Sequence, residues 1–176
     1  MSKKQAVDLN KIQTGGTFLT NVVGSQKVFC KELFSEEEKM IYEAMRDFAT
    51  NELLPLSQNE LNKKDEKLIR KLVEQMGELG FLGIDVPEKY GGSEMTKTGM
   101  CILAEGISFC GSPSFCTVWN VQTSIGSLGI IWYGNDEQKK KWLPGICSGE
   151  KIAAFGLTEP EAGSDATNSK TTGVLS

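Results

Sequence analysis

The side chains best suited to bind a polar ligand lie near the end of the chain, in residues 155–176. Thr158 and Ser164 carry hydroxyl groups that both donate and accept hydrogen bonds, and Gly163 lets the backbone approach a ligand closely. Backbone N–H groups in such a turn can cradle phosphate oxygens. The same composition is typical of an ordinary polar turn, because glycine, serine and aspartate are common turn residues. Local chemistry therefore leaves a phosphate-binding loop and a plain turn both open.

A short apolar run precedes this turn and predicts a buried strand. Residues 152–157 are apolar apart from one glycine, and their number fits a strand of about five or six residues. Pro160 cannot donate to a sheet and favours an extended residue before it, so strand pairing should loosen there. The pattern changes from helical to strand-like between Gly149 and Lys151, which predicts a domain boundary. Only about 25 residues follow, too few for a β domain of several strands.

The pattern of residues 34–149 predicts a helical domain. Residues 1–33 have little periodicity, which predicts an extended N-terminal arm. Ser35 and Glu38 form a capping box that opens the first helix, and Pro55 closes it. Further helices are expected over about 65–79 with Gly80 at its left-handed end, over 96–111, over 113–133, and from Asn135 or Asp136 onward.

The helix expected over residues 113–133 is apolar on most sides. This pattern predicts a helix buried inside a bundle rather than one lying on its surface. Gly126 and Gly129 should weaken the helix by about 1 kcal/mol each relative to alanine, so both glycines need a reason. Close approach of a neighbouring helix would supply one.

Three segments, in order along the chain, resemble motifs of the acyl-CoA dehydrogenase family. Residues 158–166 (TEPEAGSDA) resemble its flavin and acyl-CoA contact motif. Residues 80–92 (GFLGIDVPEKYGG) resemble the loop after its second helix, and residues 133–149 (YGNDEQKKKWLPGICSG) resemble the helix and corner that lead into its β domain. Residues 15–21 (GGTFLTN) and 121–134 (VQTSIGSLGIIWYG) are most similar to the very-long-chain branch and its bacterial relatives. The resemblance covers nearly the whole chain, and three ordered motifs are much more specific than one.

The resemblance implies a mainly α fold. An N-terminal helical bundle over residues 34–149 is followed by the truncated start of a middle β domain over residues 150–176. It also implies an FAD-dependent oxidoreductase that converts a fatty acyl-CoA into a trans-2-enoyl-CoA, the first step of fatty acid β-oxidation in lipid metabolism. In this family a glutamate takes the α-proton, the flavin takes the β-hydrogen as hydride, and electrons pass to an electron-transfer flavoprotein. The flavin supplies the redox chemistry, and the full-length protein is expected to be a homo-oligomer.

The resemblance also implies which residues bind the cofactor. Phe155, Leu157 and Thr158 should face the isoalloxazine ring and its hydrogen-bonding edge. Gly163 and Ser164 should lie near the FAD pyrophosphate, and Ser164 should also reach the acyl-CoA substrate.

The carboxylates of the chain receive structural roles. Glu159 and Asp165 are expected to cap turns through backbone N–H groups. The family's catalytic glutamate lies in a C-terminal helical domain that this sequence lacks, and nothing places Glu105 or Glu159 within reach of a substrate proton. No residue is therefore assigned as catalytic, and this N-terminal fragment is expected to be inactive alone.

Other interpretations stay open beside this one. An acyl chain close to the helix would be a second reason for Gly126 and Gly129. An acyl-CoA oxidase or a flavin monooxygenase of the same fold would differ mainly in oxygen access and in the missing base. A non-catalytic helical association module is disfavoured, because Thr158, Gly163 and Ser164 are all intact at their motif positions.

Charge and composition bear on several further function classes. A net charge of −4 and a pI near 5.0 argue against nucleic-acid binding, which usually needs a basic face. No apolar run approaches the roughly 20 residues of a membrane span. The N-terminus lacks the apolar core of a secretory signal and the arginines of a transit peptide, so a cytoplasmic protein is expected. The five cysteines form no C-x-x-C pair and the sequence has no histidine, so no metal site is expected. The absence of histidine also argues against Ser-His-Asp catalysis. The cysteines are expected to be small buried apolar residues.

Overall fold

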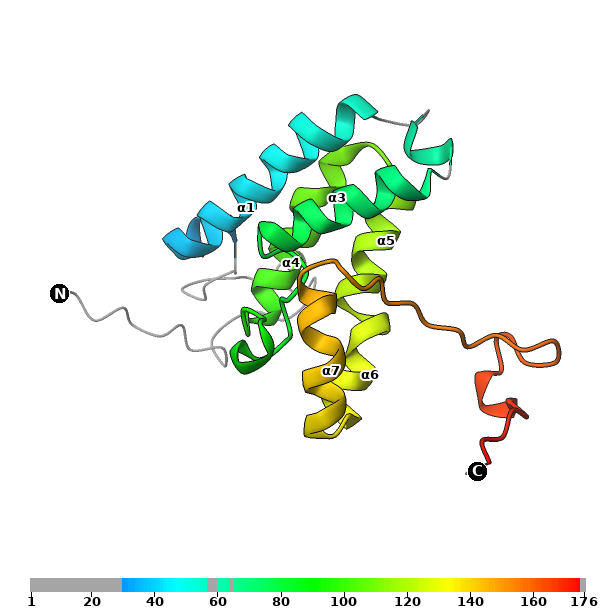
Figure 1. The fold of residues 1–176 in the computed structure, drawn as a ribbon. Coiled ribbons are helices and arrows are strands. Elements are labelled where there is room, and N and C mark those ends of the chain that lie inside the picture. Colours follow the sequence, from blue (N-terminus) through cyan, green and yellow to red (C-terminus); the bar gives the residue numbers. More distant parts are fainter. Residues whose placement is uncertain (1–29, 57–59, 64, 175–176) are drawn as a thin grey trace, which may run out of the picture. The chain divides into compact units, whose positions relative to one another are not determined.

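The structure is a computed structural model of the chain, and it describes residues 30–56, 60–63 and 65–174. These residues are mainly helical and contain no β-strand, as the ribbon in Figure 1 shows. The α-helices are α1 (Glu36–Phe48), α3 (Glu66–Glu78), α4 (Lys97–Ile107), α5 (Pro113–Thr123), α6 (Ile125–Tyr133) and α7 (Asp136–Cys147). A π turn (Ala49–Leu53) extends α1, and 3-10 turns lie at Lys31–Leu33, Leu54–Leu56, Leu61–Lys63, Glu88–Tyr90, Ser108–Cys110 and Ala166–Asn168. The predicted mainly α fold is confirmed.

The chain separates into two compact units, Met1–Met40 and Ile41–Ser176, with the division inside α1. In the first unit the predicted capping box is present. The Ser35 N–H donates to Glu38 Oε2 at 2.7 Å, and the Glu38 N–H donates to Ser35 Oγ at 3.1 Å. Most of the predicted N-terminal arm, including the motif over residues 15–21, lies outside the described residues.

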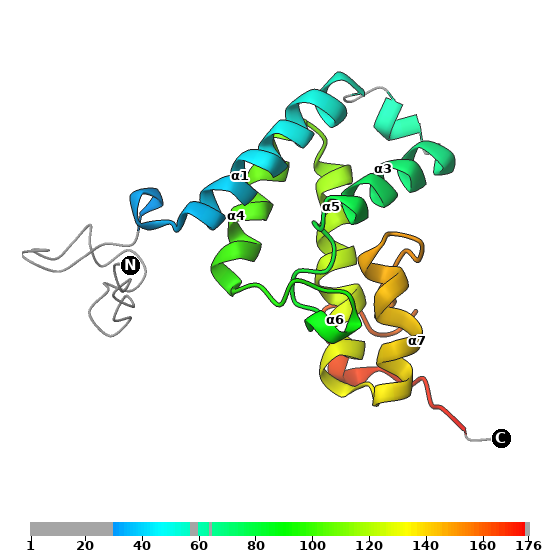
Figure 2. The ribbon, with the colours of Figure 1, turned by 60° about the vertical axis from the view of Figure 1, so that its left-hand side comes forward.

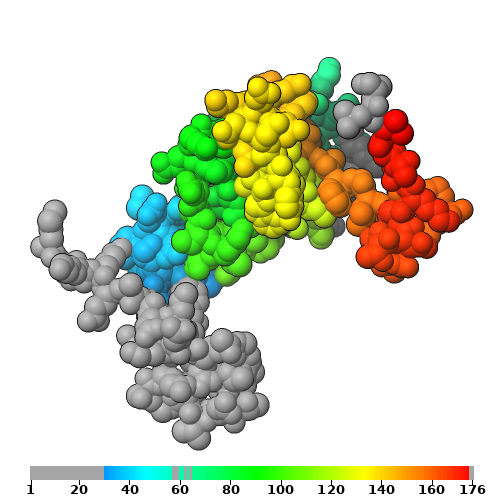
Figure 3. Space-filling model, turned by 90° about the horizontal axis from the view of Figure 1, so that it is seen from below, coloured from blue at the N-terminus to red at the C-terminus, as the bar shows by residue number. Residues whose placement is uncertain are grey.

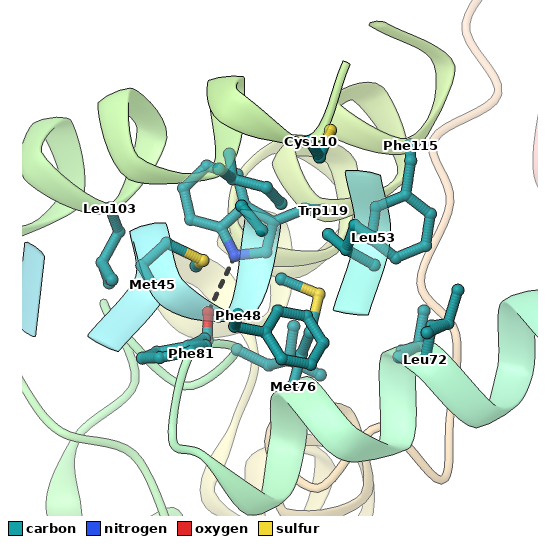
Figure 4. Close-up of a cluster of buried hydrophobic side chains, with 14 of the residues drawn as sticks. Met45, Phe48, Leu53, Leu72, Met76, Phe81, Leu103, Cys110, Phe115 and Trp119 are labelled. Atoms are coloured by element: carbon teal, nitrogen blue, oxygen red, sulfur yellow. Dashed lines mark hydrogen bonds between the residues drawn. The ribbon is translucent and has the colours of Figure 1, made fainter. Parts of the chain in front are cut away.

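In the second unit, the main core gathers side chains from α1, α3, α4 and α5 (Figure 4). Its labelled members are Met45, Phe48, Leu53, Leu72, Met76, Phe81, Leu103, Cys110, Phe115 and Trp119, all buried. The indole N–H of Trp119 donates to the Phe81 carbonyl oxygen at 3.0 Å. Phe81 begins the loop that resembles a family motif, so α5 fixes this loop from inside the core. Farther along, the loop closes on itself through the Met95 N–H and the Ile84 carbonyl oxygen at 2.8 Å.

Most predicted helix ends match the structure. Asp65 caps α3 by accepting from the Lys67 and Leu68 N–H groups, and Gly80 follows it with φ of +77°. Thr96 caps α4 through the Gly99 N–H at 3.2 Å. Asn135 and Gln138 form a capping box at α7. These ends follow from local hydrogen bonding, which a sequence displays directly.

The single helix predicted over residues 113–133 is wrong. The chain breaks at Ser124, whose φ of −127° and ψ of −102° are not helical, and α6 starts anew at Ile125. The Ser124 hydroxyl bonds the Asn120 carbonyl oxygen, so it competes with the backbone at the break. Gly126 lies two residues after Ser124 and lowers helix propensity further.

The expected burial of this region holds for α5 only. In α6 the buried residue is Ser127, whereas Trp132 is 61% exposed. The α6–α7 region lies uncovered on the face drawn in Figure 3, and α6 and α7 run side by side in Figure 2. A small second core joins α7 to the turn Glu88–Tyr90 through Tyr90, Leu143 and Ile146.

The strand predicted over residues 152–157 is also absent from the part of the chain that the structure describes. Ile152, Phe155 and Leu157 are exposed by 43%, 53% and 48%. A strand needs a neighbour for its N–H and C=O groups, and no described segment lies beside this one as a strand. The predicted domain boundary at 149–151 stays a prediction.

Candidate functional site

A buried glutamine joins the end of α7 to the segment that follows it. Gln122 of α5 is 1% exposed. Its Nε2 donates to the Ile146 carbonyl oxygen at 2.9 Å and to the Lys151 carbonyl oxygen at 2.8 Å. Its Oε1 accepts from the Ala153 N–H at 2.7 Å. The carboxamide thus fixes residues 151–154, here called the root segment, which lead directly to Phe155.

The two glycines of α6 have different surroundings. A Cβ at Gly126 would lie 2.9 Å from Ala153 Cβ and 2.8 Å from the Val121 carbonyl oxygen, so this position admits no side chain without a shift. A Cβ at Gly129 would meet nothing within 4 Å. Close packing therefore accounts for Gly126, with the root segment rather than a helix as the neighbour. For Gly129, the alternative explanation, that the glycine leaves space for a ligand, stays open.

Two adjoining hollows lie along α6 and α7, with Ile130 and Trp142 in both linings. The larger, of about 470 Å³, has an apolar floor and two cations, and is lined by Arg70, Gly126, Ile130, Trp142, Ile146, Glu150, Lys151, Ile152, Ala153 and Ala154. The smaller, of about 300 Å³, is lined by Gly129, Ile130, Tyr133, Gly134, Gln138 and Trp142. Lys151 Nζ pairs with Glu150 Oε1 at 2.8 Å. The largely apolar linings are suited to hold an apolar chain.

The segment beyond the root forms a self-closed loop over residues 158–171, here called the motif loop. An isolated antiparallel bridge joins Glu159 and Ala162, with N–H to oxygen distances of 3.0 and 3.2 Å. The Glu159 carboxylate accepts from the Lys170 N–H at 2.7 Å and from the Thr171 N–H at 3.2 Å. Hydrogen bonds from Thr171 and from the Lys170 N–H hold the pKa of Glu159 below its ordinary value. The predicted structural role of Glu159 is confirmed.

Asp165 behaves differently from its prediction. It precedes the turn Ala166–Asn168 but makes no side-chain cap to a backbone N–H. Instead its Oδ1 accepts from the Thr167 hydroxyl at 2.6 Å. A hydroxyl two residues along competes successfully for the carboxylate, so the expected backbone partner is wrong.

The five predicted cofactor residues lie together in sequence and are uncovered. Thr158 and Gly163 flank the bridge of the motif loop, so the two residues leave it next to each other. All five are exposed, and the ribbon leaves the helices after the root segment (Figure 1). Among the residues that the structure describes, the side chains of Thr158 and Ser164 make no hydrogen bond. The side chains of Phe155 and Leu157 and the two hydroxyls are therefore not used in packing or hydrogen bonding within the described chain.

Sequence reasoning missed Gln122 as a site residue. A weak signal was present, because Gln122 is the longest polar side chain in a stretch that is mostly apolar. An amide in such a place is costly to bury unless it is hydrogen-bonded, which points to a specific partner. The partners are backbone groups some 24 to 31 residues away, and a single sequence does not display them.

The cysteines match their predicted character in part. Cys110 and Cys147 are buried, Cys116 is intermediate, and Cys30 and Cys101 are exposed. The Cys110 and Cys116 sulfur atoms lie 3.5 Å apart. Burial, followed by the hydrogen bond with Cys110, raises the pKa of Cys116 to about 12, and burial raises that of Cys147 to about 11. High thiol pKa values favour the neutral, unreactive form.

In the described residues, no helix is long and apolar enough to cross a membrane.

Comparisons with known proteins show which sequences and structures this chain is similar to. Residues 35–150 match the family described as "Acyl-CoA dehydrogenase, N-terminal domain". A "Probable acyl-CoA dehydrogenase" of Bacillus subtilis (strain 168) is 43% identical over 175 residues, which are 99% of this chain and 28% of the relative. A crystal structure of an acyl-CoA dehydrogenase complexed with FAD from Bacillus anthracis superposes with a TM-score of 0.77 at 44% identity, covering 89% of this chain and 26% of the other.

A further solved structure is similar over a comparable range. It is titled as an electron transferring flavoprotein of Acidaminococcus fermentans, with a TM-score of 0.71 at 34% identity, covering 84% of this chain and 38% of the other. The chain thus spans between about a quarter and two fifths of the length of these proteins.

Proposed function

Because this chain belongs to the acyl-CoA dehydrogenase family, whose N-terminal domain its residues 35–150 match, we propose that it forms the flavin-proximal N-terminal part of an FAD-dependent acyl-CoA dehydrogenase. The single observation that carries the proposal is the uncovered, intact motif at residues 155–166, directly after the matching helical domain. The proposed reaction turns a fatty acyl-CoA into a trans-2-enoyl-CoA. FAD, when bound, accepts the hydride.

The proposal gives each motif residue a task. The apolar side chains of Phe155 and Leu157 pack against the isoalloxazine, and the Thr158 hydroxyl bonds its polar edge. Gly163 lets the backbone approach the pyrophosphate, and the Ser164 hydroxyl serves both FAD and the acyl-CoA. These tasks agree with the exposure of all five residues and with the free hydroxyls of Thr158 and Ser164 in the described chain. The α-proton is taken by a glutamate in the remainder of a longer protein, as the coverage of 28% of the Bacillus subtilis relative suggests.

The finer parts of the proposal concern substrate and partners. The hollow beside Gly129 and Trp142 would take part of an acyl chain, and the motif at residues 121–134 favours the very-long-chain branch. An electron-transfer flavoprotein would be the electron acceptor. A cytoplasmic location and a homo-oligomeric full-length protein complete it.

A chimera tests the proposal directly. This chain would replace the matching 175 residues of the Bacillus subtilis relative, with the unaltered relative as control. We expect the chimera to purify yellow with FAD and to reduce an artificial electron acceptor when given acyl-CoA esters, with a preference for long chains in a C4–C18 series. A folded, colourless chimera that takes up no FAD, beside an active control, contradicts the proposal. Activity with oxygen alone would favour an oxidase of the same fold.

Alanine substitutions at two serines of the motif loop distinguish a loss of ligand binding from a general disturbance of the loop. Ser164→Ala in the chimera should weaken FAD or acyl-CoA binding by about 1 kcal/mol or somewhat more, from one lost hydrogen bond. Ser169→Ala is the matched control, because the Ser169 hydroxyl donates within the loop to the Ala166 carbonyl oxygen at 2.8 Å. Equal effects of both changes on FAD affinity would show that Ser164 has been misplaced.

A further inference from the structure

Two unrelated contacts converge on one backbone residue, Ala153. On one side its N–H donates to the buried Gln122 carboxamide at 2.7 Å. On the other side Gly126 leaves room for its Cβ, since a side chain at Gly126 would lie 2.9 Å from it. Gln122 and Gly126 are four residues apart, on either side of the break at Ser124. The break between α5 and α6 is therefore where the root segment is gripped.

We propose that Gln122 and Gly126 form a clamp that positions the flavin-facing residues by fixing the chain at Ala153. The assignment deepens the proposed function and rests on it for the identity of the ligand. Gln122 and Gly126 are positioning residues, since they act through the root segment.

The hydrogen bonds of Gln122 are suited to this task. All three partners are backbone groups, so the clamp fixes the path of the chain whatever side chains the root segment carries. The Lys151 peptide is held at both of its groups, because its N–H also donates to the Gly145 carbonyl oxygen at 2.8 Å. Ile146, Lys151 and Ala153 are thereby tied to one carboxamide, which joins the last turn of α7 to the root segment.

The distance from the clamp to the proposed flavin contacts is short. Phe155 is two residues beyond Ala153, about 7 Å along an extended chain. Beyond the root, Gly156 has no neighbour that an added Cβ would touch within 4 Å, and Phe155 and Leu157 are half exposed. The direction in which these side chains leave the helical body is therefore set at Ala153 more than by their own packing.

The test uses the full 176-residue chain without flavin, so that it is independent of the proposed function. Gln122→Met keeps the size and length of the side chain but removes all three hydrogen bonds. Gly126→Ala keeps the hydrogen bonds but pushes on Ala153. Thr117→Val is the control, because the Thr117 hydroxyl donates only within α5, to the Pro113 carbonyl oxygen at 3.0 Å. Amide hydrogen exchange and ¹⁵N relaxation are read at the root segment, at Phe155 and at Leu103 in the main core.

We expect Ala153 to exchange at least about tenfold faster in Gln122→Met, since several hydrogen bonds are lost. Order parameters at Phe155 should fall in both clamp variants, while Leu103 and the control change little. The double variant should add little to either single change, because a released root segment cannot be released again. If Gln122→Met does not fold, Gly126→Ala carries the same test.

Wild-type exchange at Ala153 and unchanged order parameters at Phe155 in the folded variants would overturn the clamp. A role in core packing alone predicts that outcome for the isosteric methionine. Loss of flavin binding in the unmutated chimera would instead contradict the proposed function and leave the exchange result standing.

Discussion

The hydrogen bond between Trp119 and Phe81 makes Trp119→Phe an informative change. Trp119 is 2% exposed, and its indole N–H donates to the Phe81 carbonyl oxygen at 3.0 Å (Figure 4). Phenylalanine leaves that carbonyl without its donor in a buried place, which costs about 1–3 kcal/mol. It also leaves a cavity of about 40 Å³, which costs about 1 kcal/mol more. We therefore expect the free energy of unfolding to fall by roughly 2–4 kcal/mol.

Urea denaturation followed by circular dichroism measures this change. The slope with urea should stay constant while the midpoint falls by about 1–2 M, as expected for a domain of this size. Trp132→Phe is the matched control, because Trp132 is 61% exposed, and surface changes usually stay within about 0.5 kcal/mol. Equal midpoints for Trp119→Phe and the control would refute the reasoning, and would mean that the Phe81 carbonyl finds another donor without cost.

Four further predictions concern the buried cysteines, the cap of α3 and the motif residues. In a thiol titration at pH 8, exposed Cys101 should react quickly, while Cys116 and Cys147 should react only on unfolding, because their pKa values are raised to about 12 and about 11 by burial. The stability from these two neutral thiols is present below the ordinary pKa of 9.0 and is lost as pH rises towards 11–12. The thermal unfolding midpoint should therefore fall between about pH 9 and pH 12. The fall should be smaller in Cys116→Ser than in the unmutated chain. Asp65→Ala should cost about 1 kcal/mol in urea denaturation, through loss of the α3 cap, and an unchanged midpoint would contradict it. The 176-residue chain alone should show no stoichiometric FAD binding by fluorescence quenching and no acyl-CoA oxidation, since no described segment pairs with residues 152–157 to hold the motif residues in place; tight binding would refute this.

Features that depend on a few neighbouring residues could be predicted from the sequence. The capping box of Ser35 and Glu38 and the caps Asp65 and Thr96 are local hydrogen bonds between residues two or three apart. The left-handed glycine after α3 belongs to the same class. The polar turn after residue 157 is local too, because the bridge between Glu159 and Ala162 closes it, although the N–H groups that the Glu159 carboxylate accepts from belong to Lys170 and Thr171, farther along the chain.

Features that depend on distant partners could not be predicted. The break at Ser124 lies within an apolar pattern that looked continuous, and the root segment that packs on Gly126 comes from 27 residues farther along, at Ala153. The strand over residues 152–157 failed for a related reason. Its composition suits a strand, but strand formation is a property of a pair of segments, and the second member is not among the described residues.

Apolar residues with a similar sequence pattern are buried in some parts of this chain and exposed in others. Those of α3, α4 and α5 face one another and form the main core. Those at Ile125, Trp132 and Phe155 are exposed by about half or more, yet their composition predicted burial just as strongly. Scattered apolar side chains are common on protein surfaces, whereas contiguous apolar patches mark interaction sites. Phe155 and Leu157 stand out among them because they lie shortly before Thr158 and Ser164 in the sequence, whose hydroxyls make no hydrogen bond among the described residues. Under the proposed function, these two apolar side chains and two hydroxyls would contact the flavin and its acyl substrate, and the proposed clamp at Ala153 would position them.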